Sequence, residues 1–273
     1  METRRRPKVG LALGAGGARG LAHIGVLKAF EAHQVPIDYV AGSSMGSFIG
    51  ALYANGIAPH MMEKLALNLK RKHWLDLTMP NLGFVAGEKV KQLIELLTHG
   101  KTFAELALPL AVVATDIERG ERVVFREGPV ARAVRASISI PGIFVPERVG
   151  ERLLVDGGVI DRVPTTVARE MGADIVIAVD VAQFDVKMKV NSIYDVIAQT
   201  IDVMEREILR YRILSADMVI RPQVGHYSSI AYHAVNEIIA EGERMALEHV
   251  AEIKQLIDNW RESDAGESDN DEN

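Results

Sequence analysis

The sequence predicts an α/β protein in which helices cover both faces of a mostly parallel central sheet, a three-layer α/β/α arrangement. Short apolar runs alternate with longer segments of helical periodicity. The apolar runs are continuous, which is typical of strands buried on both faces. Neither an internal repeat nor a linker divides the chain. We therefore expect one domain over residues 1–261, followed by an acidic tail at 262–273 whose composition predicts disorder.

The first half of the chain opens with a predicted buried strand, "KVGLALG" (8–14). A glycine-rich loop follows, and "LAHIGVLKAFEAHQ" then has the apolar spacing of a helix. A second strand is predicted at "DYVAG" (38–42), with a helix from about Ser44 to Asn55. Helical periodicity returns in "PHMMEKLALNLK" and in "GEKVKQLIELL".

The second half continues the alternation with a strand at "LPLAVVATDI" (108–117), which a turn joins to a partner strand in "RGERVVF". "PVARAVRASIS" is helical and ends at Pro141 and Gly142. "ERLLVDGG" is a strand that enters a turn, "PTTVAREMG" a helix and "DIVIAVDV" a buried strand. We expect the domain to close with a long amphipathic helix at 192–216, a strand in "MVIRPQV" and a helix at 232–258.

Composition and charge exclude several classes of function. The net charge of -6 gives no support to a nucleic-acid partner. The chain has no cysteine, so disulfides, cysteine nucleophiles and thiolate metal sites are excluded. No apolar stretch reaches the ~18 residues of a membrane span. The N-terminus imitates a signal peptide, but its apolar run is half glycine and alanine, and Arg19 interrupts the next segment. We expect a cytoplasmic protein.

A Gly-x-Ser-x-Gly pattern lies at residues 42–46, "GSSMG", between a predicted strand and a predicted helix. A nucleophile elbow requires that position, because the serine must project from a very tight strand-to-helix turn. The helix N-terminus would favour negative charge beside the serine. The alternative is an ordinary serine cap at the start of the helix. The context favours the elbow, with Ser44 as the exposed serine.

The loop "LGAGGARG" between the first strand and the first helix can direct backbone N–H groups at one anion. A pyrophosphate is one such anion and a tetrahedral oxyanion is another. The dinucleotide fingerprint fails, because Arg19 occupies its last glycine position. Asp38 also lies at the beginning of the second strand, whereas a ribose-binding carboxylate should lie at its end. The loop and the serine therefore share the carboxyl edge of the sheet, an arrangement suited to acyl transfer.

A serine hydroxyl needs a base to act as a nucleophile. Most of the eight histidines lie as single polar positions in helical patterns, which favours exposed or capping roles. The other candidate is Asp156 in "LLVDGGVIDRVP", which ends an apolar strand. Burial beside Leu154 and Val155 would raise its pKa from the ordinary value of about 3.9 and make it a better base. A tight Asp-Gly hairpin turn is the simpler explanation of the same residues.

Five blocks resemble the patatin-like phospholipase family, bacterial branch. They span residues 10–164 in the family's order: "GAGGARGLAHIGVL", "GSSMGSFIGALYA", "VVATDIERGERVVF", "ASISIPGIFVPERV" and "LLVDGGVIDRVP". The resemblance implies a patatin-like fold and a Ser-Asp dyad without histidine, with Ser44 as nucleophile and Asp156 as base. It also implies hydrolysis of phospholipid, lysophospholipid or similar lipid esters, with no metal or cofactor. The implied oxyanion hole is the loop Gly14, Ala15, Gly16, Gly17, Ala18, Arg19 and Gly20.

Three residues depart from the family pattern. Ala15 stands where the family often has glycine, and its N–H group can still serve an oxyanion hole. Asp161 stands near a frequent asparagine, where its carboxylate would either raise the pKa of Asp156 or cap the next helix. Arg119 replaces a smaller residue, with no effect that the sequence defines.

Two rival functions remain open at this point. One is a conventional α/β-hydrolase esterase with a Ser-Asp-His triad, whose histidine would be His226 or His233. The other is a non-enzymatic domain that binds a nucleotide or a lipid. The apolar residues of the segment 73–87, "HWLDLTMPNLGFVAG", allow two interpretations as well. They form either a loop packed on the core or a flap at a lipid-binding mouth that makes transient contact with a membrane surface.

Overall fold

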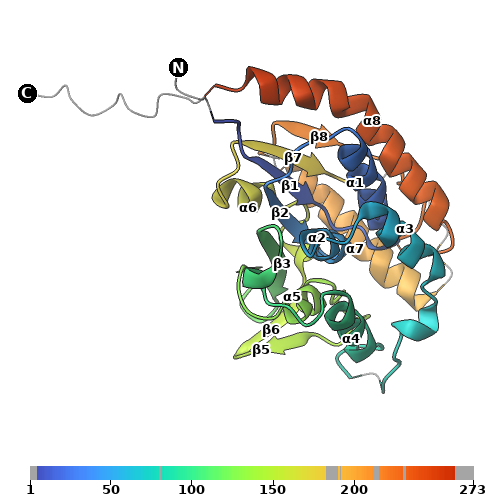
Figure 1. The fold of residues 1–273 in the computed structure, drawn as a ribbon. Coiled ribbons are helices and arrows are strands. Elements are labelled where there is room, and N and C mark those ends of the chain that lie inside the picture. Colours follow the sequence, from blue (N-terminus) through green and yellow to red (C-terminus); the bar gives the residue numbers. More distant parts are fainter. Residues whose placement is uncertain are drawn as a thin grey trace, which may run out of the picture.

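The computed structural model describes residues 5–261 except 80, 183–189, 191, 212–214 and 230–231, so the predicted acidic tail lies outside the described residues. Its centre is an eight-stranded mixed sheet with the order β5-β6-β3-β2-β1-β7-β8, and β4 pairs with β3 beside this path. Helices cover both faces, as Figure 1 shows. The predicted three-layer α/β class is confirmed.

The strands divide into a parallel group and an antiparallel group. β1, β2, β3, β7 and β8 pair in parallel, and β4, β5 and β6 pair antiparallel. The parallel strands are β1 (Val9–Leu13), β2 (Tyr39–Ser43), β3 (Leu110–Asp116), β7 (Ile175–Val179) and β8 (Met218–Ile220). The antiparallel strands are β4 (Glu121–Phe125), β5 (Glu147–Val149) and β6 (Arg152–Asp156).

The helices follow the expected segments closely. They are α1 (Ala22–Ala32), α2 (Met45–Ala54), α3 (Pro59–Asn68), α4 (Glu88–Leu97), α5 (Val130–Ser137), α6 (Thr165–Glu170), α7 (Ile193–Tyr211) and α8 (Val235–Asn259). Short 3₁₀ turns are η1 (Gly17–Leu21), η2 (Arg71–His73), η3 (Phe103–Glu105) and η4 (Gly157–Val159). In Figure 1, α8 lies along the outside of α1, while α6 lies on the other side of the sheet.

The two largest hydrophobic cores lie on opposite faces of the sheet. The alternation of side chains along β1 directs Leu11 and Leu13 into the larger core, which is shared with α1 and α2. Ala12 faces the smaller core on the opposite face, where it packs with Val167 and Ala168 at α6. Both faces of the central strands are therefore buried, which explains their continuous apolar sequences.

Two sequence predictions were wrong in detail, and one strand was not predicted. The helix expected at 192–216 is not helical at Ser215 and Ala216, because these residues lead directly into β8. The strand expected at 218–224 ends at Ile220, since Pro222 cannot donate to a sheet ladder. The strand that was not predicted is β5, whose "ERV" has too few apolar residues to predict an edge strand.

The arrangement around β3 brings the ends of β2 and β6 together. β2 runs parallel to β3 and pairs Ser43 with Val113, whereas β6 runs antiparallel and pairs Asp156 with Ala114. β4 occupies the other edge of β3, so β2 and β6 share one edge. Their carboxyl ends therefore meet at neighbouring positions of β3, although they are far apart in sequence.

Candidate active site

Ser44 lies between the end of β2 and the start of α2, with φ 51° and ψ -123°. Residues other than glycine adopt such positive φ values rarely, and a strained turn of this kind is characteristic of nucleophile elbows. The next turn requires glycine at position 46, because a Cβ there would lie 2.1 Å from the Leu13 carbonyl oxygen. The elbow is held by hydrogen bonds from the Ser44 N–H group to Ser137 Oγ (2.8 Å) and from the Ser47 hydroxyl to the Ser44 carbonyl (2.7 Å).

The Ser44 hydroxyl donates a short hydrogen bond of 2.5 Å to Asp156 Oδ2. The other carboxylate oxygen, Oδ1, accepts the Gly158 N–H group at 2.8 Å. The Asp156 main chain is held from both sides: its N–H group donates to the Ser139 carbonyl, and its carbonyl accepts from the Thr115 hydroxyl. The structure therefore brings together the two residues that the sequence analysis selected, Ser44 and Asp156.

Burial raises the pKa of Asp156 to about 6, because a buried carboxylate loses its hydration. The hydrogen bonds from Ser44 and Gly158 and the positive charge of Arg162 act in the opposite direction. The side chain is only 6% exposed. A carboxyl group with this pKa is a stronger base than an ordinary aspartate and is still ionised at neutral pH.

The loop from Gly14 to Gly20 passes beside Ser44, but several of its N–H groups already have acceptors. Those of Gly14, Ala15, Ala18 and Arg19 donate to the carbonyls of Val179, Arg162, Ser229 and Gly16. Gly16 and Gly17 line the same small chamber as Ser44 and Asp156, a space of about 40 Å³. Gly17 must be glycine, since it has φ 56° and a Cβ would lie 2.2 Å from the Ser229 carbonyl oxygen.

A buried ionic cluster lies beside this loop. Arg19 donates to Asp202 of α7 at 2.6 Å and to the Gly16 carbonyl at 3.4 Å. Arg162 lies 3.9 Å from the same Asp202 oxygen. Burial lowers the pKa of Arg162 to about 10, with Arg19 acting in the same direction and the nearby carboxylates opposing it. The cluster ties α7 to the loop and places a positive charge near Asp156.

The histidines considered as rival bases have surroundings that differ from those of Asp156. His226 and His233 are exposed, and His226 packs against the ring of Tyr227. His23 is buried and hydrogen-bonded to the Gly14 carbonyl at 2.8 Å, and burial lowers its pKa to about 4. Within residues 5–261, apart from the gaps named above, no histidine is hydrogen-bonded to Ser44 or Asp156.

Three further residues named from the sequence have structural contacts of their own. The Asp161 carboxylate accepts from Arg122 at 2.9 Å, and Arg122 also reaches Glu170 of α6. Arg119 pairs with Asp116 in the turn between β3 and β4. Asp38 pairs with Arg6 and Lys8 at the opposite end of β2 from Ser44, the position that the sequence predicted for it.

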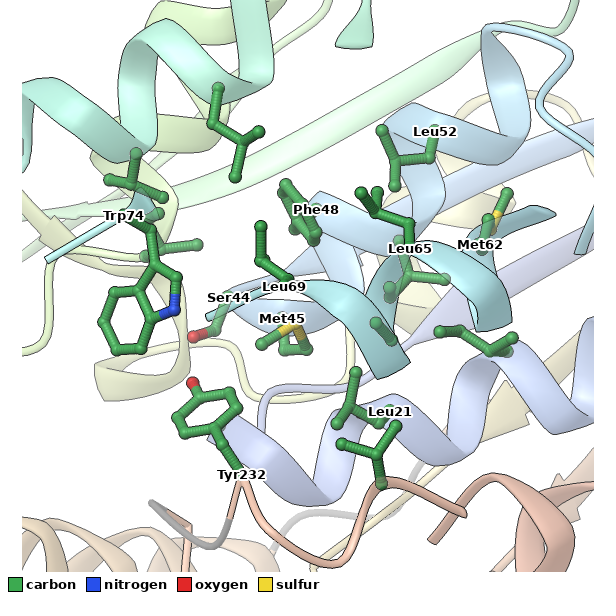
Figure 2. A pocket seen from close by; sticks show the side chains of 18 of the residues that line it. Leu21, Ser44, Met45, Phe48, Leu52, Met62, Leu65, Leu69, Trp74 and Tyr232 are labelled. Atoms are coloured by element: carbon green, nitrogen blue, oxygen red, sulfur yellow. The ribbon is translucent and has the colours of Figure 1, made fainter. Parts of the chain in front are cut away.

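A larger apolar pocket of about 520 Å³ also opens at Ser44. Figure 2 shows Ser44, Trp74 and Tyr232 at one end and Leu52 and Met62 at the other. The remaining wall comes mainly from α1, α2, α3 and α4, and it includes Leu21, Ile24, Met45, Phe48, Ile49, Leu65, Leu69, Val90 and Leu93. The exposed His233 also borders this pocket. Ser44 therefore lies where a large apolar pocket meets the small chamber beside the glycine-rich loop.

The pocket wall, Arg162 and Asp202 were not predicted from the sequence. One signal was present for the wall: Met45, Phe48, Ile49 and Leu52 have the spacing of one helix face that begins at the serine. No local signal identifies Asp202, because its partner Arg19 is distant in sequence. In the part of the chain that the structure describes, no cluster of histidine and carboxylate residues suits a metal ion, and no helix is long and apolar enough to cross a bilayer.

Several known proteins are similar to this chain in sequence. A human protein, patatin-like phospholipase domain-containing protein 6, is 40% identical over 185 residues, which cover 65% of this chain and 14% of that protein. An uncharacterized NTE family protein of Mycobacterium tuberculosis is 39% identical over 176 residues, covering 63% of this chain and 49% of that protein. Lysophospholipase NTE1 of Pyricularia oryzae is 39% identical over 184 residues, which cover 65% of this chain and 12% of that protein. The chain thus spans half or less of the length of each.

Two solved structures share the fold. VipD from Legionella pneumophila aligns with a TM-score of 0.65 and 13% identity, covering 91% of this chain and 67% of VipD. The type III effector protein ExoU aligns with a TM-score of 0.53 and 16% identity, covering 91% of this chain and 54% of ExoU. The family model for patatin-like phospholipases matches residues 11–169, more than half of the chain. The chain belongs to the patatin-like phospholipase family.

Proposed function

We propose that this protein is a serine acyl hydrolase that cleaves lipid esters with a Ser44–Asp156 dyad. The observation that carries the proposal is the 2.5 Å hydrogen bond between these side chains at the mouth of a 520 Å³ apolar pocket. An isolated serine cap would need neither a buried carboxylate partner nor such a pocket. The curated relatives include proteins named as lysophospholipases, which supports a lipid ester as substrate.

The reaction begins when Ser44 Oγ attacks the ester carbonyl carbon while Asp156 takes the hydroxyl proton. The carbonyl oxygen becomes an oxyanion, and the Gly16 and Gly17 N–H groups stabilise its charge. The bond to the leaving alcohol then breaks, and the proton on Asp156 passes to that alcohol. This leaves an acyl group on Ser44.

Deacylation repeats the same two steps, with water as the nucleophile. The water oxygen attacks the acyl carbon while Asp156 accepts a proton from the water. The second tetrahedral intermediate then releases the fatty acid. Ser44 regains the proton from Asp156, so the dyad returns to its starting state. Gly16 and Gly17 carry the oxyanion role in this proposal, because the neighbouring loop N–H groups donate to protein carbonyls.

We also propose that the segment around residue 79 contacts a lipid surface. Leu77, Met79 and Leu82 are 71%, 87% and 54% exposed. Trp74, in the same segment, lines the pocket that opens at Ser44. Lys70 lines the pocket and Lys72 is exposed, so both positive charges would attract an anionic lipid surface. This local attraction would oppose the repulsion from the net charge of -6 on the whole chain. A substrate could then leave the bilayer directly into the pocket.

Hydrolysis by single-serine variants tests the proposed function. We expect Ser44→Ala to lose activity on ester and phospholipid panels by a factor on the order of 10⁴ or more, with an unchanged melting temperature. Ser43→Ala is the matched control, because Ser43 is buried at the end of β2 and does not line either chamber described here. It should retain measurable activity. Equal activity of Ser44→Ala and the wild type would refute the assignment.

A further inference from the structure

The apolar pocket is elongated, with an open mouth at Ser44 and a closed end. Its mouth contains the polar or amphipathic residues Ser44, Lys70, Trp74 and Tyr232. Its other end is closed by Leu52 of α2 and Met62 of α3, each only 1% exposed. Figure 2 shows the side chains of Phe48, Leu65 and Leu69 between these two ends. A chain whose carbonyl carbon lies at Ser44 would therefore extend along α2 and stop at Leu52 and Met62.

Two measures limit the length of that chain. Ser44 and Leu52 are eight residues apart at 1.5 Å per helical residue, a span of about 12 Å. An extended chain advances ~1.1–1.2 Å per bond, so about ten bonds cover this distance. A methylene group has nearly the volume of a water molecule, ~30 Å³. The 520 Å³ pocket therefore holds roughly 17 methylene groups.

We propose that this pocket binds a single acyl chain of about 10 to 17 carbons, whose methyl end contacts Leu52 and Met62. The inference rests on the proposed hydrolase function and adds to it the class of acyl group. On the other side of Ser44, the chamber of about 40 Å³ is lined by Asp156, Arg162 and Asp202. That chamber has room for about one water molecule, and it is too small for a second acyl chain.

The test is a chain-length profile of kcat/KM on p-nitrophenyl esters from butyrate to stearate. The wild type should have its maximum within the proposed range. Leu52→Phe adds three carbon atoms at the closed end, so its maximum should move to chains shorter by about three carbons. Met62→Ala removes three non-hydrogen atoms from the same end, so its maximum should move to chains longer by about three carbons.

Leu27→Ala is the matched control, because Leu27 is fully buried in α1 but does not line the pocket. Its maximum should not move. Melting temperatures identify any variant that fails to fold. If Leu52→Phe does not fold, Met62→Ala still tests the proposal, because its maximum should move to longer chains. A maximum that stays at the wild-type length in both folded variants would overturn the proposal.

The profile also separates this inference from the proposed function. Hydrolysis of butyrate esters that depends on Ser44, with no maximum at longer chains, would refute the chain-length assignment and leave the hydrolase standing. No Ser44-dependent hydrolysis at any chain length would refute the proposed function itself. The hydrolysis rates of the wild type and Ser44→Ala on the same ester series distinguish these two outcomes.

Discussion

Ser44 has a backbone conformation that costs free energy, and the surrounding structure maintains it. Non-glycine residues at positive φ carry strain on the order of 1–3 kcal/mol, which persists only where neighbouring contacts impose the geometry. Here the contacts are the Ser137 hydroxyl, the close approach of Gly46 to β1 and the carboxylate of Asp156. This conformation directs the Ser44 hydroxyl at the Asp156 carboxylate, as the proposed mechanism requires.

Asp156 should control the pH dependence of hydrolysis. The base must be ionised, and burial raises its pKa to about 6, so the carboxylate form dominates above that pH and is lost below it. We expect kcat/KM to fall on the acid side with a midpoint near pH 6. Asp156→Asn should lower kcat by about 10²–10⁴-fold, because an amide cannot accept the proton. A profile without an acid limb between pH 4 and pH 8 would contradict this role.

Variants of Arg162 should shift the acid midpoint of the pH profile in a predictable direction. Its positive charge lowers the pKa of Asp156, while Arg19, Asp202 and Asp180 are the other charged groups around Arg162. Removal of the charge in Arg162→Met should move the acid midpoint to higher pH, whereas Arg162→Lys should keep it near the wild-type value. A structural role alone would lower the rate at every pH and leave the midpoint in place. Kinetic profiles of the two variants distinguish these outcomes.

At the scale of elements, the meeting of β2 and β6 on one edge of β3 explains how two distant motifs form one site. The sequence predicted both strands and the two motifs at their ends. It did not predict that β6 is antiparallel to β3, because pairing direction depends on contacts between distant segments. The strand β5 and the turn before β6 supply that reversal, and their short polar sequences have no clear periodicity.

The two ends of the segment 73–87 have different surroundings. Val85 is buried, and the N–H groups of Phe84 and Val85 donate to the Ile143 carbonyl, so this end packs on the domain. Leu77 and Met79, by contrast, are largely exposed. The sequence alone could not assign each apolar residue, because the segment has neither the period of a helix nor that of a strand.

At the scale of the whole molecule, the proposed membrane contact combines an exposed apolar loop with local positive charge. Leu77→Ser with Met79→Ser should weaken binding to vesicles that contain phosphatidylglycerol by at least about tenfold, since each buried Leu or Met side chain contributes ~1.5–3 kcal/mol. Turnover of a short soluble ester should be retained. Leu247→Ser on α8 is the matched control for an exposed apolar residue. Equal vesicle binding by all three proteins would contradict the proposed contact.

The overall architecture was predictable because strand and helix periodicities are local properties of the sequence. The candidate dyad was predictable because Gly-Ser-Ser-Met-Gly and Asp-Gly-Gly are local motifs. The pocket was not, since its wall joins α1–α4 to Tyr232, and no segment shows this assembly by itself. Asp202 illustrates the same limit, because only the folded chain places it beside Arg19.

The central claim is that Ser44 is the nucleophile, and covalent labelling with a fluorophosphonate tests it most directly. The protein is incubated with the reagent, digested and analysed by mass spectrometry to locate the modified residue. We predict a single adduct on Ser44, which is retained in Ser43→Ala and absent from Ser44→Ala. An adduct on Ser43 or on any other residue, or no adduct on the folded wild-type protein, would contradict it.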